Sequence, residues 1–226
     1  MNLIVGDSHT DWLEFENHVH LSCSAGSAKG LNNPNSISGY NNLIISNVKN
    51  NNYKNLFFLF GGVDVDFSFI HNFLKNPELN YIDFNVTVIK NYLEFITQNF
   101  YDKSVIILSV GLPVLNDDNL KEGLLNGHIN SLESIDLINL KNTLLNKELP
   151  NIFERTKITL DFNQQLEQEI SKLNVPNIKF LDITSFTYDA SLKRIKDTFF
   201  SGNDHHNFTR NKFFTQIIND FVKLED

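Results

Sequence analysis

The sequence predicts an α/β fold in which helices cover both faces of a five-stranded parallel sheet. Apolar runs alternate with amphipathic segments along the chain, and three of these runs are apolar almost throughout. Glycine-rich or polar segments follow most of the apolar runs directly. This alternation is typical of a three-layer α/β/α domain, and five strands favour the flavodoxin-like order 2-1-3-4-5.

Five apolar runs are the predicted strands. They are Asn2–Gly6, His18–Cys23, Asn55–Gly62, Ser104–Pro113 and Asn177–Ile183. The first, third and fourth have almost no polar interruption, which indicates strands that are buried on both faces.

Five segments with apolar residues at helical spacing are the predicted helices. They are Thr10–Asn17, Asn35–Asn50, Phe84–Phe100, Arg155–Leu173 and Arg210–Leu224. Each connects two strands or follows the last one, as a parallel sheet requires.

The 226 residues suit a single domain, which we expect to span residues 1–226. The stretch Leu115–Pro150 is longer than an ordinary connection and has weak helical periodicity. We interpret it as a surface excursion that contains a helix. The alternative is a lid inserted over the edge of the sheet.

Composition excludes several classes of partner. The formal net charge of −8 disfavours a nucleic-acid partner, because such a surface repels phosphate backbones. The chain has one cysteine, Cys23, so we expect a small buried residue and no internal disulfide. No signal peptide or membrane-spanning run is visible, so we expect a soluble, intracellular protein without a membrane partner.

The segments that follow the predicted strands hold the residues best suited to chemistry. They are Ser8, Ser24–Leu31, Gly61–Asp66, Gly111–Asp118 and, beyond the fifth strand, Gly202–Asn207. Ligands of open α/β sheets bind beyond the carboxyl ends of the strands. The sequence therefore predicts one site at that edge.

Ser8 has two interpretations. Serine is a favoured N-cap, and for an isolated Gly-Asp-Ser this is the simpler one. The alternative is a nucleophile, which needs a base such as histidine and backbone N–H donors for the oxyanion. His205 and His206 lie before the last helix, and glycines follow the second strand.

The segments VGDSHT and SAGSAKGL, taken in order with FGGVD and GNDHHNF, resemble the SGNH, or GDSL, hydrolase superfamily. We use block for each of the four matching segments. In the first block the resemblance makes Ser8 the nucleophile. In the second block it implies an oxyanion-binding glycine N–H, with Gly30 the first choice and Gly26 the second.

The third block reads Gly61-Gly62-Val63-Asp64. Its glycine and aspartate match the family pattern, whereas Val63 stands where the family has an oxyanion-binding asparagine. The resemblance therefore implies a weaker oxyanion hole than that of other members. We expect Asp64 to be structural or to contact substrate.

The last block contains Asn203, Asp204, His205 and His206. The resemblance makes His206 the general base, with His205 as its rival. Asn203 occupies the position of the triad aspartate, so either Asp204 orients the imidazole from a shifted loop or a Ser–His dyad works with a backbone carbonyl.

Four acidic or basic residues lie in or beside these blocks. We expect Asp7 to shape the turn at Ser8, and His9 either to contact substrate or to be a half-exposed helix residue. Asp64 and Asp66, after the third strand, have two interpretations: a carboxylate pair or metal site, or a solvated strand end, which is the simpler one. We predict no metal and no cofactor.

These features predict a serine esterase that removes an acyl group, most simply acetyl, from a carbohydrate or a small ester. The sugar preference follows from resemblance to a subgroup of sugar-modifying SGNH-like proteins. The alternatives are an acyltransferase to a sugar acceptor and a catalytically silent carbohydrate-binding module. A nucleotide-binding protein is disfavoured, because no phosphate-binding glycine loop follows the first strand. The sequence makes no prediction of the oligomeric state.

Overall fold

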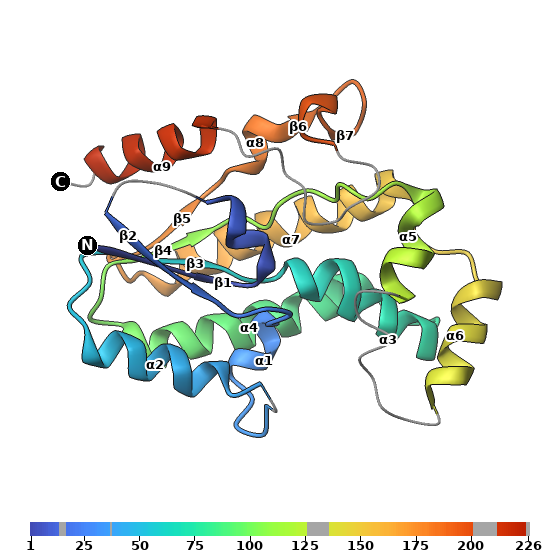
Figure 1. The fold of residues 1–226 in the computed structure, drawn as a ribbon, viewed down its shortest axis with the longest axis horizontal. Coiled ribbons are helices and arrows are strands. Elements are labelled where there is room, and N and C mark those ends of the chain that lie inside the picture. Colours follow the sequence, from blue (N-terminus) through green and yellow to red (C-terminus); the bar gives the residue numbers. More distant parts are fainter. Residues whose placement is uncertain (14–16, 37, 126–135, 201–211, 225–226) are drawn as a thin grey trace.

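The computed structural model describes residues 1–13, 17–36, 38–125, 136–200 and 212–224, and is built around a five-stranded parallel sheet (Figure 1). The strand order is β2-β1-β3-β4-β5, so the predicted fold class and order are confirmed. The strands are β1 (Asn2–Gly6), β2 (His18–Ser22), β3 (Leu56–Leu59), β4 (Val105–Leu108) and β5 (Ile178–Leu181). A small antiparallel pair, β6 (Tyr188–Asp189) and β7 (Arg194–Ile195), was not predicted.

Four strands, β2 to β5, are shorter than the apolar runs predict, and β3 and β4 differ most. β3 ends at Leu59 because Gly61 adopts a φ of +118°, a left-handed conformation that turns the chain out of the sheet. β4 ends at Leu108, yet the Ser109 N–H still donates to the Leu181 carbonyl at 3.0 Å. Apolar residues therefore continue past the ladder at the edge where the site is expected.

Successive side chains of the central strands enter two separate cores. Leu3, Val5 and Phe58 face one core, whereas Ile4 and Phe57 face the other. All five are fully buried. The two covered faces explain why these strands lack polar interruptions.

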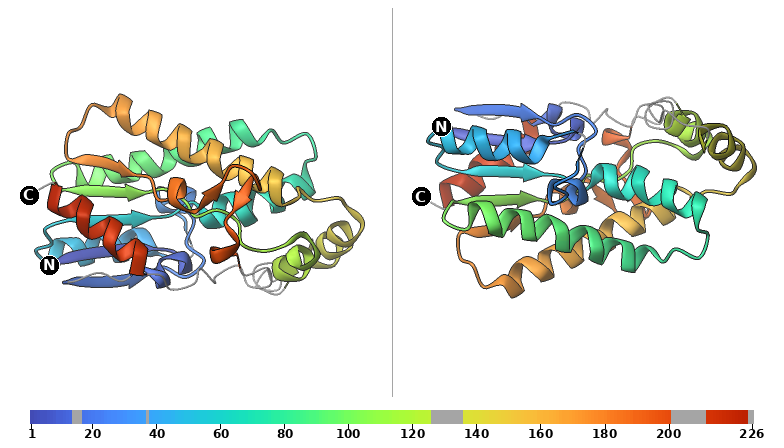
Figure 2. Two further views of the ribbon diagram at one scale, coloured as in Figure 1. Left: turned by 90° about the horizontal axis from the view of Figure 1, so that it is seen from above. Right: turned by 90° about the horizontal axis from the view of Figure 1, so that it is seen from below.

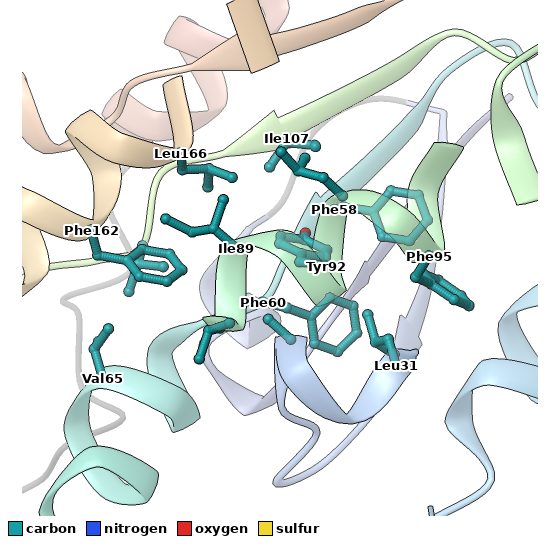
Figure 3. Close-up of a cluster of buried hydrophobic side chains, with 14 of the residues drawn as sticks. Leu31, Phe58, Phe60, Val65, Ile89, Tyr92, Phe95, Ile107, Phe162 and Leu166 are labelled. Atoms are coloured by element: carbon teal, nitrogen blue, oxygen red, sulfur yellow. The ribbon is translucent and has the colours of Figure 1, made fainter. Parts of the chain in front are cut away.

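Helices α1, α2, α4 and α7 cover the first face (Figure 2, right). They span Ala28–Leu31, Tyr40–Asn50, Tyr81–Phe100 and Ile152–Leu173. Figure 3 shows their shared core, where Tyr92 of α4 lies among Phe60, Ile89 and the other rings and aliphatic side chains. Helix α7 begins with a capping box formed by Asn151 and Glu154.

The second face is covered by α9 (Lys212–Leu224), together with Leu13 and Phe199 (Figure 2, left). Phe214 and Ile218 of α9 are fully buried in the same core as Ile4 and Phe57 of the sheet. The short helices α8 (Thr184–Thr187) and η4 (Asp197–Phe199) lie between β5 and α9 in the chain.

Two helices near the N-terminus differ from their predictions. In place of a helix over Thr10–Asn17, the structure has a 3-10 helix, η1 (Ser8–Trp12), which ends as Leu13 returns to an extended conformation. The helix predicted over Asn35–Asn50 begins only at Tyr40, after Gly39 takes a left-handed φ of +62°. In both cases periodicity located the helix, and local turn chemistry moved its bounds.

The stretch after Leu115 forms α5 (Asp117–Leu124) and α6 (Asp136–Asn146), which lie beside α3 (Phe69–Lys75). The Lys121 ammonium donates to the Leu145 carbonyl at 3.0 Å, and Lys147 donates to the Phe73 carbonyl at 3.3 Å. The first contact joins α5 to α6, and the second attaches the end of this helix pair to α3. Whether the helix pair also acts as a lid stays a prediction. No helix among the described residues is long and apolar enough to cross a bilayer.

Candidate active site

The first block lies at the carboxyl end of β1, between β2 and β3. Gly6 ends the strand, and a side chain there would overlap the Leu59 carbonyl oxygen and the Thr10 methyl group. Only glycine allows β1 and β3 to approach so closely with η1 starting at Ser8. The Ser8 side chain is half-buried, at the start of η1.

Asp7 caps this turn and holds the residue on the far side of Ser8. Its Oδ1 accepts the His9 backbone N–H at 2.9 Å and lies 2.8 Å from His9 Nδ1. Both side chains are buried, with residue exposures of 1% for Asp7 and 8% for His9. Thr10 Oγ1 donates to the Asp7 carbonyl at 2.7 Å. Ser8 is thus enclosed in a turn made rigid from both sides.

The second block forms the turn that leads into α1. The Gly26 N–H donates to the Cys23 carbonyl at 2.7 Å, and the Gly30 N–H donates to Ser27 Oγ at 3.0 Å. Both amides that the resemblance assigns to the oxyanion hole are therefore bonded within their own turn. Their catalytic role stays a prediction, and it would require these bonds to be exchanged for one to the substrate.

The third block turns the chain from β3 into the π-helical segment η2 (Asp64–Ser68), which continues as α3. Besides its positive φ, Gly61 has no room for a side chain, since a Cβ would lie 2.8 Å from Val110 Cγ2 and 3.0 Å from the Phe162 ring. A Cβ on Gly62 would lie 3.0 Å from His9 Nδ1. The His9 ring therefore packs directly on the Gly62 backbone.

Asp64 joins the third block to the second. Its Oδ2 accepts the Ala28 N–H at 2.6 Å and its Oδ1 accepts the Lys29 N–H at 3.4 Å. Burial raises the pKa of this carboxyl to about 7, although the two backbone donors lower it. Asp64 is 1% exposed, so in the structure it is a buried residue that links the two blocks.

Asp66 lies two residues after Asp64, within η2, and is half-buried, so it is not a solvated strand end. Burial raises its pKa to about 6, against the lowering effects of the positive Arg155 and of His9. Burial and, secondly, the Asp7 charge raise the pKa of the Cys23 thiol to about 12, so the thiol is protonated at neutral pH. No three or more His, Cys, Asp and Glu residues in the described ranges lie close enough together to hold a metal ion.

Two buried polar residues of α7, absent from the predicted site, hold the segment after β4. Arg155 Nη2 donates to the Leu115 carbonyl at 2.7 Å and to Asp117 Oδ1 at 2.9 Å. Asn163 donates to the Val110 carbonyl at 2.9 Å and accepts the Val110 N–H at 2.8 Å. The available signal was their place on the buried face of an amphipathic helix.

The last block lies outside the described residues. Asp204, His205 and His206, with Asn203, fall between Phe200 and the start of α9 at Lys212. The contact between Ser8 Oγ and an imidazole nitrogen stays a prediction, as does the choice between His205 and His206.

Comparison with known proteins identifies the fold. No protein-family model matches the sequence, and no curated protein does. Three solved structures resemble the chain over nearly its whole length. The first is a protein from Bacteroides fragilis that is assigned as an acylhydrolase. It has a TM-score of 0.55, 10% identity and coverage of 99% of this chain and 86% of that one.

The second is an acetylxylan esterase from Geobacillus stearothermophilus, with a TM-score of 0.52, 12% identity and coverage of 98% and 93%. The third, a member of the lipolytic G-D-S-L family from Veillonella parvula, has a TM-score of 0.51, 16% identity and coverage of 98% and 97%. With the strand order and the Gly-Asp-Ser turn at the end of β1, these likenesses show that the chain has the SGNH, or GDSL, hydrolase fold.

Proposed function

We propose that the protein is a serine hydrolase that cleaves acyl esters through an acyl-Ser8 intermediate. The observation that carries the proposal is the placement of Ser8. It is half-buried at the carboxyl end of β1, in a turn whose residues on both sides are held by hydrogen bonds. A reactive side chain held in one orientation lowers the entropic part of the barrier to attack.

The reaction assigns roles to the predicted serine, histidine and glycine. Ser8 Oγ attacks the acyl carbonyl while His206, or His205, takes its proton, and the same imidazole returns the proton to the leaving alcohol. Water then attacks the acyl-serine with the same base, which releases the acid and restores Ser8. The N–H of Ser8, at the start of η1, would contribute to binding the oxyanion, together with a glycine N–H of the second block.

We propose that the substrate is an acetyl ester of a carbohydrate. Support comes from the likeness to the acetylxylan esterase. An acyltransferase would use the same side chains and differ only in whether water or a sugar hydroxyl reaches the acyl-enzyme.

A panel of p-nitrophenyl acetate and acetylated sugars tests the proposal, with intact-mass measurement of rapidly quenched protein. We expect acetate release and a transient mass increase of one acetyl group in wild type, and neither in Ser8→Ala. Release of acetate at equal rates by both proteins would contradict the proposal.

A second candidate, a catalytically silent carbohydrate-binding module, is favoured by one feature. Val63 offers no side-chain donor, and the Gly26 and Gly30 amides are already bonded. Such a module would bind acetylated sugars equally well as wild type and as Ser8→Ala, with no turnover. Calorimetric titration of both proteins with the same sugars distinguishes the two candidates.

A further inference from the structure

We propose that Asp7 and His9 act as a clamp that positions Ser8, with His9 as a positioning residue for the proposed acyl transfer. The inference rests on the proposed function and deepens it, because it names how the nucleophile is held. The clamp is the pair of contacts from Asp7 Oδ1 to the backbone N–H and to the ring Nδ1 of His9.

Asp7 spans Ser8 through a single carboxylate oxygen. One carboxylate oxygen accepts the backbone N–H of the residue two positions later and also faces a ring nitrogen of that residue at 2.8 Å. The backbone contact alone is an ordinary Asx turn, which many serine-containing turns have. The ring contact is the unusual part, because it fixes the His9 side chain against the same oxygen.

The ring contact also requires one tautomer of His9. A carboxylate is an acceptor only, so His9 must present Nδ1–H to Asp7. Asp7 is 1% exposed, which makes its hydrogen bond to an N–H donor costly to lose. The buried carboxylate thereby fixes both the rotation and the tautomer of the ring.

The His9 ring also contacts the third block. The His9 ring contacts the Gly62 backbone so closely that a Cβ there would lie 3.0 Å from Nδ1. Two residues further on, Asp64 bonds the first turn of α1 through Ala28. His9 therefore connects the Ser8 turn to the third block, and Asp64 extends that connection to the second block.

This arrangement predicts which amide can replace the imidazole. The side-chain N–H₂ of asparagine reaches the position of Nδ1, whereas that of glutamine reaches the position of Nε2. We would measure the second-order rate at which a fluorophosphonate labels Ser8 in His9→Ala, His9→Asn and His9→Gln, with circular dichroism and melting as the folding check. His71→Asn, on α3, is the matched histidine control.

If the clamp acts through Nδ1, His9→Ala and His9→Gln label about 100-fold more slowly than wild type, as expected for a nucleophile about an ångström out of place. His9→Asn and His71→Asn then label at close to the wild-type rate. Equal labelling of His9→Ala and wild type would overturn the clamp and leave the proposed function intact. Rescue by glutamine and not by asparagine would also overturn it, because the ring would then act through Nε2.

A second measurement judges the clamp independently of reactivity at Ser8. Nitrogen-15 NMR of the imidazoles should show His9 protonated at Nδ1 in wild type, with this signal shifted in Asp7→Asn. A neutral His9 protonated only at Nε2 would overturn the inference. If wild type gives the expected spectrum but is never labelled, the proposed function fails and the clamp remains.

Discussion

The two halves of the candidate site's edge are held in different ways. At β1 the turn after the strand is held by contacts between near neighbours, such as those between Asp7 and His9, and by Gly6, which lets the backbones of β1 and β3 approach. Beyond β4 the segment from Ser109 to Asp117 has no such turn, and side chains of α7 from about forty to fifty residues away hold it. The Ser8 turn is therefore held by its own neighbours in the chain, whereas the segment after β4 depends on the packing of α7.

The largest expected effect breaks the short-range half at its closest approach. In Gly6→Ala the new methyl group would overlap the Leu59 carbonyl, which belongs to a central strand and cannot move away. We expect a loss in free energy of unfolding of at least about 3 kcal/mol, measured by urea denaturation. Gly123→Ala is the control, since its methyl would meet only the end of the Leu115 side chain. Equal, small losses in both variants would contradict the close approach of β1 and β3.

The next effect breaks the long-range half at Arg155. Arg155→Met leaves the Leu115 carbonyl without its donor and removes a buried charge that faces Asp117 and Asp66. We expect a loss of about 2–4 kcal/mol in urea denaturation. Arg194→Met is the matched control, because Arg194 pairs with the exposed Asp197 and its loss should cost less than about 1 kcal/mol. An Arg155 variant as stable as the Arg194 variant would refute the anchoring role of α7.

Substitutions at Asn163 separate the effects of its two hydrogen bonds to Val110. Asn163→Leu leaves both the N–H and the carbonyl of Val110 without a side-chain partner, and we expect a loss of about 2 kcal/mol. Asn163→Asp keeps an acceptor for the Val110 N–H and loses the amide donor to the carbonyl. Because the new carboxyl group titrates, the pH dependence of this variant's stability should differ from that of wild type. Thermal melting at several pH values measures both. An unchanged melting temperature in Asn163→Leu would show that this segment does not depend on α7.

Over a single pH unit, the smallest effect is a pH dependence of stability that comes from Asp64, which links the second and third blocks. The pKa of Asp64 is raised by burial to about 7, so the folded protein binds this proton more tightly than the unfolded chain does. Stability should therefore fall as the pH rises from about 4 to 7, by at most about 1.4 kcal/mol per pH unit for each such proton. Asp66, with a pKa raised to about 6, acts in the same direction.

Denaturation curves between pH 5 and pH 8 measure this slope. Asp64→Asn keeps an oxygen acceptor for the Ala28 N–H and removes the titration, so its slope should be shallower than that of wild type. A variant with the wild-type slope would show that Asp64 is charged throughout this range.

Much of the fold could be predicted from the sequence, because its causes are local or periodic. Uninterrupted apolar runs such as that of β3 indicate burial on both faces, and the order of strands and helices limits the topology to few choices. The Gly-Asp-Ser turn was also visible, since Gly6, Asp7 and Ser8 are adjacent. The bounds of β3 and η1 were missed because a positive φ and close packing of backbones leave little trace in hydropathy.

The rest of the site depends on contacts between distant residues. Arg155 bonds a carbonyl forty positions earlier, and Asp64 bonds an amide thirty-six positions earlier. The periodicity of α7 places Arg155 on its buried face, but nothing in the local sequence identifies the Leu115 carbonyl as its partner. The contact between Asp7 and His9 spans only two residues, but it depends on a rotamer that the ring adopts against Gly62.

The most direct test of the central claim is the intact mass of the protein after exposure to a fluorophosphonate at pH 8, with wild type beside Ser8→Ala. The account predicts one adduct on wild type, located at Ser8, and none on the variant. Equal labelling of the two proteins, or no labelling of either after long exposure, would contradict the assignment of Ser8 as the nucleophile.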